Sequence, residues 1–337
     1  MAIVRDVIPS LQLFQPATLD EAAELIHEFG GEAWIMAGGM DSFDWLKDRT
    51  KRTEAVIELS QVGELKGIRE VDGGLEIGAM TTLTEVAESD AVRARFGLLA
   101  EAAELVASPQ IRNQGTLGGN VSQDTRCAYY RSGWPCYRAG GNHCYANTRE
   151  SMNREHAILH ASRCVAVSPS DTAPALLALD AQMVIRRGAR ERVVDAADYF
   201  LGPDIDIMRM TVLRPGDLLT AIRIPGMWAG ARFYFEKIRD REVWDFPLVN
   251  VASAIREIDG RIEEARIAVG AVAARPLRLR AVEEALSGAS VDDGTAAMAG
   301  ELAITGARPL RFNGYKVPLM RNLVRRAVRG GAPQASA

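Results

Sequence analysis

"MAGGMDS", from Met36 to Ser42, is the stretch on which the fold prediction depends. The residues before it read as a buried strand, and two consecutive glycines then let the backbone turn outward with no Cβ in the way of a phosphate. A second stretch, "RNQGTLGGN" from Arg112 to Asn120, repeats the pattern with hydroxyl and amide neighbours. Taken singly, each stretch is more often a tight turn at the end of a strand. Neither is a GxGxxG or a GxxxxGK[ST] motif, so a nucleotide here would be held in another way.

Outward from these stretches, the pattern predicts alternating helices and strands. "TLDEAAELIHEFGG" carries a capping box at Thr18 and Glu21, and Gly30 and Gly31 can end the helix. "AWIMAGG" and "AVIELS" read as strands, and "GLEIGAMTTLTEVAES" as a strand feeding a helix that Thr82 or Thr84 caps. "SPSDTAPALLALDA" predicts another capped helix, "QMVIRRGARERVVD" a hairpin and "LLTAIRIPG" a strand. Beyond residue 225 come two long β-rich runs of alternating pattern and further helices.

The composition is that of an ordinary globular protein. The 337 residues are 47% hydrophobic and 25% charged, which suits two domains. A formal net charge of -4 argues against nucleic-acid binding, and the basic "RNLVRRAVRG" is expected to be a solvated helix face. We find no apolar run near the roughly 18 residues of a membrane span and no signal-peptide pattern. A cytoplasmic location is therefore expected, with export beside a signal-bearing partner left open.

The four cysteines lie within one window, at Cys127, Cys136, Cys144 and Cys164. The stretch from Thr116 to Cys144 lacks a hydrophobic period and is expected to be neither helix nor strand. Such a segment cannot order itself by apolar burial. Four thiolates bound to a metal centre can offset the conformational entropy that the segment loses when it becomes ordered. A zinc site would use the same ligands but usually shows short C-x2-4-C pairs, which are missing. Disulfides and unrelated buried thiols are weaker alternatives, and His143 and His156 are expected to be solvated or hydrogen-bonding.

Several stretches resemble the FAD-binding medium subunits of the molybdenum hydroxylases, the xanthine dehydrogenase, carbon monoxide dehydrogenase and 4-hydroxybenzoyl-CoA reductase family. "AGGMDSFDWL" is similar to that family's AGGTDLL phosphate loop, "IRNQGTLGGN" to its RNxGTLGGN loop, and "IGAMTTLTEVA" to the stretch between them. "SPSDTAPALLALDA", "ARIAVGAVAARPLRLR" and "FNGYKVPLMRNLVRRAV" resemble later parts of the same family. The resemblance covers nearly the whole chain in order. One departure is Met40, where the family usually has Thr.

The resemblance implies an α+β fold: a vanillyl-alcohol-oxidase or PCMH-type FAD-binding domain of two subdomains, followed by a smaller α/β C-terminal domain. We place the FAD-binding domain at 1–225, with subdomains at about 1–60 and 61–225. The C-terminal domain would span 226–330, with a flexible tail at 331–337. Most of the family passes directly from the TLGGN loop to the "SPSD" helix, so about 124–165 would be an insertion.

The resemblance also implies the residues that bind FAD. The phosphate loop would offer its amides, and the second loop would lie near the ribityl chain and pyrophosphate. Asp171 would accept from the adenosine ribose, although capping of its helix is an equal alternative. Lys237 would lie near the isoalloxazine, with a surface strand lysine as the alternative. The full set is Ala37, Gly38, Gly39, Met40, Asp41, Ser42, Thr81, Thr116, Gly118, Gly119, Asn120, Asp171 and Lys237.

In a subset of the family the insertion holds a 4Fe-4S cluster. "RCAYYRSGWPCYRAGG" followed by "HAILHASRCVAVSPSD" looks most like the version found in aldehyde oxidoreductases. The resemblance therefore implies that Cys127, Cys136, Cys144 and Cys164 ligate one such cluster.

The function implied is that of an electron-transfer subunit without catalytic residues of its own. A molybdopterin-binding large subunit and a 2Fe-2S small subunit would be its partners in a heterotrimer or a dimer of heterotrimers. Electrons from aldehyde or aromatic and heterocycle oxidation would pass through FAD here to an external acceptor. A stand-alone flavin oxidoreductase of the same fold is one alternative, and a zinc-stabilised scaffold that has lost flavin is another.

Overall fold

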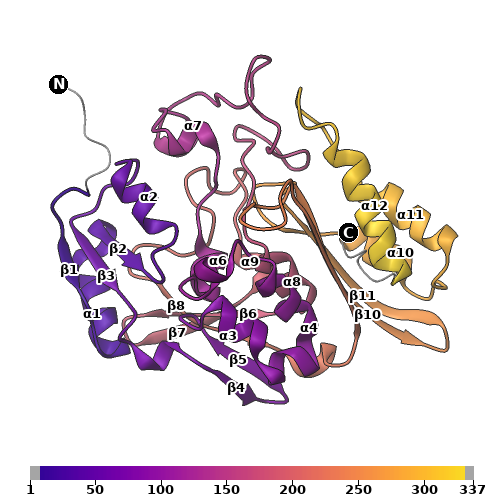
Figure 1. The fold of residues 1–337 in the computed structure, drawn as a ribbon, viewed down its shortest axis with the longest axis horizontal. Helices are drawn as coiled ribbons and strands as arrows, with labels where there is room; N and C mark the ends of the chain where they lie inside the picture. The colour runs from indigo at the N-terminus through magenta and orange to yellow at the C-terminus, as the bar shows by residue number, and fades with distance from the viewer. Residues whose placement is uncertain (1–7, 331–337) are drawn as a thin grey trace.

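The computed structural model describes residues 8–330, and the predicted tail at 331–337 lies outside the described residues. Figure 1 shows three sheets along the molecule, with the cysteine-containing loops above them around α7. The predicted α+β architecture is confirmed, and the three sheet units follow one another from the indigo end of the fold to the yellow end.

The first unit is a small parallel sheet in the order β1-β3-β2. Helix α1 (Leu19–Phe29) packs on it, and Thr18 accepts from the Glu21 amide as its cap while Gly30 ends it at a φ of 51°. Helix α2 (Ser42–Lys47), which the sequence pattern did not predict, starts directly after the first glycine stretch. The strands are β1 (Gln12–Phe14), β2 (Ala33–Met36) and β3 (Ala55–Glu58).

The second unit is a five-stranded antiparallel sheet in the order β4-β5-β8-β6-β7. Strand β8 is the last of these in the chain yet lies at the centre, so it joins the early hairpin to the late one. The strands are β4 (Ile68–Val71), β5 (Gly74–Gly78), β6 (Gln182–Arg187), β7 (Arg190–Asp195) and β8 (Leu218–Ile224). The helices of this unit are α3 (Leu83–Glu88), α4 (Asp90–Glu104), α8 (Thr172–Ala178) and α9 (Ala196–Tyr199).

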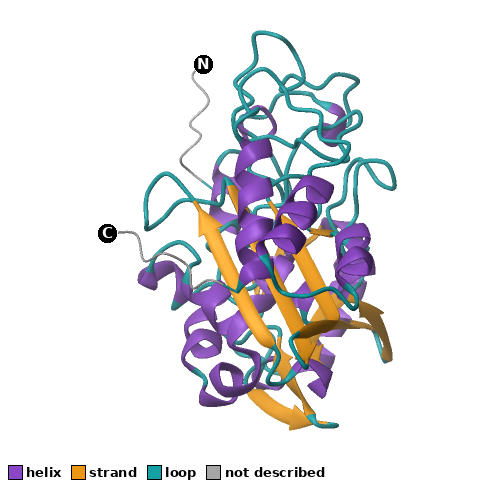
Figure 2. Ribbon diagram, turned by 90° about the vertical axis from the view of Figure 1, so that its right-hand side faces the viewer, coloured by secondary structure: helices purple, strands orange, loops and turns teal. Residues whose placement is uncertain are grey.

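The third unit is a four-stranded antiparallel sheet with helices on one side (Figures 1 and 2). The other side of this sheet contacts α8 and α4 of the second unit. The two predicted β-rich runs are thus three long strands and a short one: β9 (Arg232–Ile238), β10 (Val249–Ile258), β11 (Arg261–Gly270) and β12 (Leu277–Arg278). The helices are α10 (Arg280–Leu286), α11 (Asp293–Ala303) and α12 (Lys316–Arg329).

The segment expected to be neither helix nor strand contains short helices. Thr116 caps α6 (Leu117–Ser122) by accepting from the Gly119 amide, so "TLGGN" is the start of a helix and not a loop. Helix α7 (Ala128–Arg131) and a 3-10 turn (Tyr137–Ala139) follow. The rest is irregular chain, seen as loops at the top of Figure 2. The expectation was wrong because side-chain caps and tertiary contacts create turns of helix that leave no hydrophobic period in the sequence.

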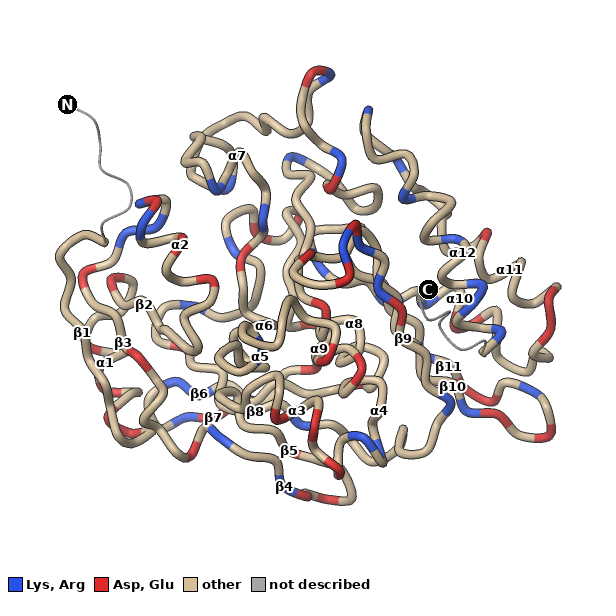
Figure 3. The backbone as a smooth tube through the Cα atoms, viewed as in Figure 1, with Lys and Arg blue, Asp and Glu red and all other residues tan. Residues whose placement is uncertain are grey.

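Figure 3 shows Lys and Arg interspersed with Asp and Glu over most of the fold. The basic run on α12 is paired with carboxylates: Arg326 with Glu236, Arg321 with Glu301, and Arg329 with Asp293. No helix within residues 8–330 combines the length and the apolar character needed to cross a bilayer.

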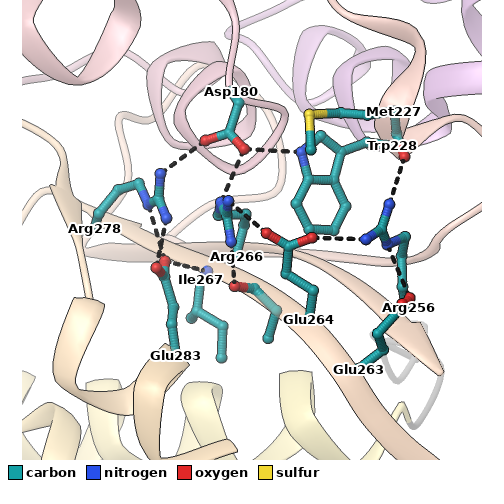
Figure 4. A network of polar contacts seen from close by, with 11 residues as sticks. Asp180, Met227, Trp228, Arg256, Glu263, Glu264, Arg266, Ile267, Arg278 and Glu283 are labelled. Carbon is teal, nitrogen blue, oxygen red and sulfur yellow. Dashed lines mark hydrogen bonds and ion pairs between the residues drawn. The ribbon is translucent and has the colours of Figure 1, made fainter. Parts of the chain in front are cut away.

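A polar network joins the second and third units (Figure 4). Asp180 follows α8 and accepts from Trp228 Nε1 at 2.9 Å, Arg266 Nε at 2.8 Å and Arg278 Nη1 at 2.7 Å. The two arginines lie on β11 and β12, so one carboxylate holds the third sheet against the second unit. Glu283 on α10 also pairs with Arg278, which extends the network to the outer helices.

Replacing Asp180 with Asn should weaken this junction. The variant keeps a similar shape but leaves two arginines without their shared anion, at a cost of about 2 kcal/mol of unfolding free energy. Urea unfolding followed by tryptophan fluorescence measures the loss. Asp198→Asn, at an exposed position of α9, is the control and should unfold like the wild type. Equal midpoints for all three proteins would contradict the role given to Asp180.

Candidate functional site

A cavity of about 570 Å³ lies between the first and second units, and residues of the loop after β9 also line it. Ten of the residues predicted to bind FAD line it: Ala37, Gly38, Gly39, Met40, Asp41, Ser42, Thr116, Gly119, Asn120 and Asp171. Thr81, Gly118 and Lys237 are not among its lining residues. The tertiary structure therefore brings the two glycine stretches to one site, although 73 positions separate Met40 from Asn113 in the chain.

The first glycine stretch presents free backbone donors. Within residues 8–330, no hydrogen-bond partner is present for the amides from Gly38 to Asp41, whereas the Ser42 and Phe43 amides donate to the Gly39 carbonyl. Gly39 has a φ of 75°, a conformation that turns successive N–H groups toward one side. Met40 brings no hydroxyl, so only its backbone can bind an anion. These free donors, on a cavity wall without Cβ atoms at two positions, fit a pyrophosphate.

In the second glycine stretch, the amides at the start of α6 are bonded within the protein. Leu117 donates to the Thr81 carbonyl, Gly118 to the Ala79 carbonyl and Gly119 to Thr116 Oγ1. A Cβ on Gly118 would lie 2.7 Å from Ala79, so this glycine allows close packing beneath the cavity. Thr81 holds the start of α6 through its carbonyl. The stretch thus shapes the cavity, and the first stretch supplies the donors.

The two stretches touch each other through backbone atoms. A Cβ on Gly38 would lie 1.8 Å from the Gln114 carbonyl oxygen, and one on Gly119 would lie 3.6 Å from Ala37 Cβ. Gly38 therefore lacks a side chain because Gln114 occupies that space, and not only because a phosphate must approach. Any side chain at Gly38 would separate the two walls of the cavity.

Asp171, which lines the cavity, forms a buried ion pair with Lys237 behind it in the protein. Lys237 Nζ lies 2.6 Å from Asp171 Oδ2 and donates to the Leu105 carbonyl at 2.9 Å, while Asn250 donates to Asp171 Oδ1. Burial raises the pKa of Asp171 and lowers that of Lys237, and their mutual attraction opposes both shifts. Asp171 makes no capping bond to α8, and the Lys237 side chain is fully buried. Capping and a surface strand lysine, the two alternatives, are thus both wrong.

Several lining residues were not predicted from the sequence. They come from β2, from α2 and the chain after it, from the insertion, from the segment before β8 and from the loop after β9. They include aromatic and basic side chains: Trp34, Trp45, Lys51, Arg126, Met208, Arg209, Trp244 and Phe246. The Trp244 amide donates to the Ala107 carbonyl at 2.8 Å, and both residues have positive φ angles. No periodic signal marks these positions, because loops far apart in the chain meet only in the folded protein.

All four cysteines line a second, smaller cavity within the predicted insertion. They are free thiols; Cys136 and Cys164 are buried, and Cys127 and Cys144 are partly exposed. Burial raises the pKa of Cys127, and it raises that of Cys164 to about 12. In the part of the chain that the structure describes, no three His, Cys, Asp or Glu side chains converge closely enough to hold a single metal ion. The thiols are arranged around a shared space.

His156 lies beside this group of thiols. Its Nε2 is 3.3 Å from Cys127 Sγ, and the Ala166 amide lies 3.5 Å from Cys164 Sγ. Burial, with a contribution from Lys316, lowers the pKa of His156 to about 4. Its position matches the hydrogen-bonding role expected for it, and His143 is exposed, with its ring 4.8 Å from that of Tyr145.

Two protein-family models match the chain. Residues 9–227 match the FAD binding domain in molybdopterin dehydrogenase, and residues 233–330 match the CO dehydrogenase flavoprotein C-terminal domain. The aldehyde oxidoreductase FAD-binding subunit PaoB of Escherichia coli K12 is 36% identical over 260 residues, which cover 76% of this chain and 79% of that protein. The carbon monoxide dehydrogenase medium chain of Hydrogenophaga pseudoflava is 29% identical over 325 residues, 95% of this chain and 96% of that protein.

The fold is also similar to solved structures. A carbon monoxide dehydrogenase from Hydrogenophaga pseudoflava has a chain that aligns with a TM-score of 0.76 and 27% identity. The alignment covers 96% of this chain and 98% of that one. Both predicted domain types are therefore present over nearly the whole length.

Replacing Gly38 with Ala should impair the cavity. The added Cβ would overlap the Gln114 carbonyl, so the first glycine stretch must move and its free amides lose their common direction. We expect a loss of FAD retention of roughly tenfold or more in affinity, measured from flavin absorbance after gel filtration. Gly31→Ala, with no atom within 4 Å of the new Cβ, is the matched control. Full flavin occupancy in Gly38→Ala would show that FAD binding does not depend on the contact between Gly38 and Gln114.

Replacing Asp171 with Asn should leave a buried cation without its anion. The loss of the carboxylate leaves Lys237 without its partner, at a cost of roughly 3 kcal/mol of unfolding free energy. The deficit should shrink as the pH rises, because burial favours the neutral amine. The double variant Asp171→Asn/Lys237→Met should regain part of the loss, since no unpaired charge remains. Chemical unfolding at two pH values tests this, and a double variant weaker than Asp171→Asn would refute it.

Proposed function

Because this chain belongs to the family of FAD-binding domains in molybdopterin dehydrogenases, we propose that it is the FAD- and 4Fe-4S-carrying electron-transfer subunit of a molybdenum hydroxylase complex. The family makes it an oxidoreductase subunit that binds FAD. The observation that supports FAD binding is the row of free amides from Gly38 to Asp41 on the wall of a large cavity. Bound FAD would supply hydride and single-electron chemistry.

The described residues of the cavity orient a flavin and do not form an acid-base pair for a substrate. The ionisable groups of its walls are already engaged: Asp41 with two arginines, Asp124 with Arg138, and Asp171 with Lys237. Such pairs hold loops in place. This supports a proposal in which the substrate is oxidised on another subunit.

The proposal of a 4Fe-4S cluster rests on the second cavity. Four thiols around one space match a cubane, in which each cysteine binds a different iron, better than a single zinc ion bound at one point. Since burial raises the pKa of Cys127 and Cys164, their thiolates would need cationic metal beside them.

We further propose a large molybdopterin-binding subunit and a 2Fe-2S small subunit as partners, in a heterotrimer or a dimer of heterotrimers. Similarity to proteins named as medium chain and FAD-binding subunit supports this. Aldehydes are the substrate class that we favour, because the relative with 36% identity is a subunit of an aldehyde oxidoreductase. Aromatic and heterocyclic substrates are the next choice.

The assembly can be tested by purification from the native source. We expect two partner chains to co-purify through interfaces of more than roughly 1,200 Å², with aldehyde oxidation only in the assembled complex. A catalytically competent single chain would instead establish the stand-alone flavin oxidoreductase.

The cluster can be tested in the anaerobically purified complex. Cys164→Ser should lower the iron content by about four per chain, together with labile sulfide and the broad iron-sulfur absorbance. His143→Ala, an exposed change in the same segment, should leave the iron unchanged. Stoichiometric zinc without sulfide in the wild type, or unchanged iron in Cys164→Ser, would refute the cluster.

A further inference from the structure

The flavin cavity and the cysteine cavity share a wall made of two aromatic side chains. Trp45 on α2 lines the first cavity and Tyr130 on α7 lines the second. Their ring centroids are 5.2 Å apart, and the side chains are 1% and 2% exposed. The start of the insertion therefore packs directly against the helix that follows the first glycine stretch.

Asp41 is the polar counterpart of this contact. It belongs to the first glycine stretch, but its carboxylate is bound from the insertion: Arg126 Nη1 lies 2.6 Å and Arg131 Nη2 2.5 Å from Oδ1. Trp45 Nε1 donates to Oδ2 at 3.0 Å. Both carboxylate oxygens are thus used by the protein, so the Asp41 side chain acts on its own loop and only the Asp41 amide stays free for a ligand.

Arg131 is held firmly at this position. Its side chain is 12% exposed, its guanidinium lies 3.6 Å over the Trp45 ring, and its Nε donates to the Thr125 carbonyl. Thr50 of the first unit also donates to the Arg131 carbonyl at 3.0 Å. Arg131 therefore contacts the first unit in three ways: an ion pair with Asp41, stacking on Trp45 and a backbone hydrogen bond from Thr50.

In a second set of ion pairs the insertion supplies the anion and the first unit the cation. Asp124, at the start of the insertion, pairs with Lys51 of the first unit at 3.3 Å and with Arg138 at 2.8 Å, and it accepts from the Tyr130 hydroxyl. Arg138 and Lys51 outweigh the effect of burial and keep the pKa of Asp124 below its ordinary value. Each side thus contributes an anion and a cation to the contact: Asp41 and Lys51 from the first unit, and Asp124 and Arg131 from the insertion.

Helix α7 links this wall to the cysteines. Cys127 immediately precedes it, Arg131 is its last residue, and the Arg131 amide donates to the Cys127 carbonyl at 2.9 Å. A helix of four residues is not stable alone, because nucleation costs more than one turn returns. Its geometry depends on what holds its two ends, which are Cys127 and the contact with Asp41.

We propose that Arg126 and Arg131 are positioning residues for the flavin, which orient the free amides of the first glycine stretch through Asp41, and that ligation at Cys127 steadies α7 and so strengthens FAD binding. The proposal extends the function proposed above. By linkage the effect is reciprocal, so bound FAD should also strengthen the binding of the metal centre. The insertion then serves the flavin site structurally, in addition to any redox role.

The test uses the purified complex after removal of FAD, with FAD affinity measured by quenching of flavin fluorescence. Arg131→Gln should bind FAD at least tenfold more weakly, and Arg131→Lys, which keeps the charge, should recover part of the affinity. Arg154→Gln is the matched control, since Arg154 is an arginine of the same insertion that pairs with Asp240 and lines neither cavity. The double variant Asp41→Asn/Arg131→Gln should be no weaker than the weaker single variant if the two residues act as one pair.

The same titration is repeated after removal of iron by a chelator. Wild type should lose FAD affinity with its iron, whereas Arg131→Gln, already weakened, should change little. Wild-type affinity in Arg131→Gln would overturn the positioning role, and an iron-free wild type with unchanged affinity would overturn the coupling. If the wild type contains no iron as isolated, the proposed cluster fails, while the Arg131→Gln comparison still decides whether the insertion positions the loop.

Discussion

The backbone contact between the two glycine stretches is the constraint on which the site depends. Gly38 lies against the Gln114 carbonyl so closely that even one methyl group would separate them. This contact brings the end of β2 against the start of α6, and the large cavity opens between them. The two stretches differ in their amides: those from Gly38 to Asp41 stay free, whereas Leu117 and Gly118 donate to the carbonyls of Thr81 and Ala79 and so fix the start of α6.

Ion pairs and apolar burial together hold the cysteine-bearing segment to the rest of the protein. The main hydrophobic clusters lie around the three sheets; Ile158 and Leu159 of the segment are buried in the cluster of the third sheet, and Tyr130 and Cys136 form a small cluster with Trp45 of α2. Arginines on and around α7 meet carboxylates and rings of the first unit. An ion pair of this partly buried kind contributes specific geometry as much as stability. It therefore suits a segment whose task is to hold neighbouring groups at fixed positions.

Local signals in the sequence predicted many elements. Thr18 and Glu21 marked the start of α1, and Thr82 capped α3 with the reciprocal bond of a capping box. Helix α2 was missed because a glycine turn and a short "SFDWLK" run carry too few turns for a periodic pattern. Helix α6 was missed because its glycines lower helix propensity, and only the Thr116 cap and its buried neighbours make it form.

The sequence by itself determined the fold class, the two glycine stretches and the grouping of four cysteines, because these depend on residue type, spacing and family resemblance. Only the tertiary structure decided which partner each charged residue meets. Lys237 was recognisable as a lysine on a strand, yet its burial against Asp171 follows from how β9 packs on α4 while α8 packs on β10 and β11. Asp41 likewise meets Arg131 across 90 positions of chain. Such pairs leave no local pattern, because the distance between the partners is set by the packing of whole elements.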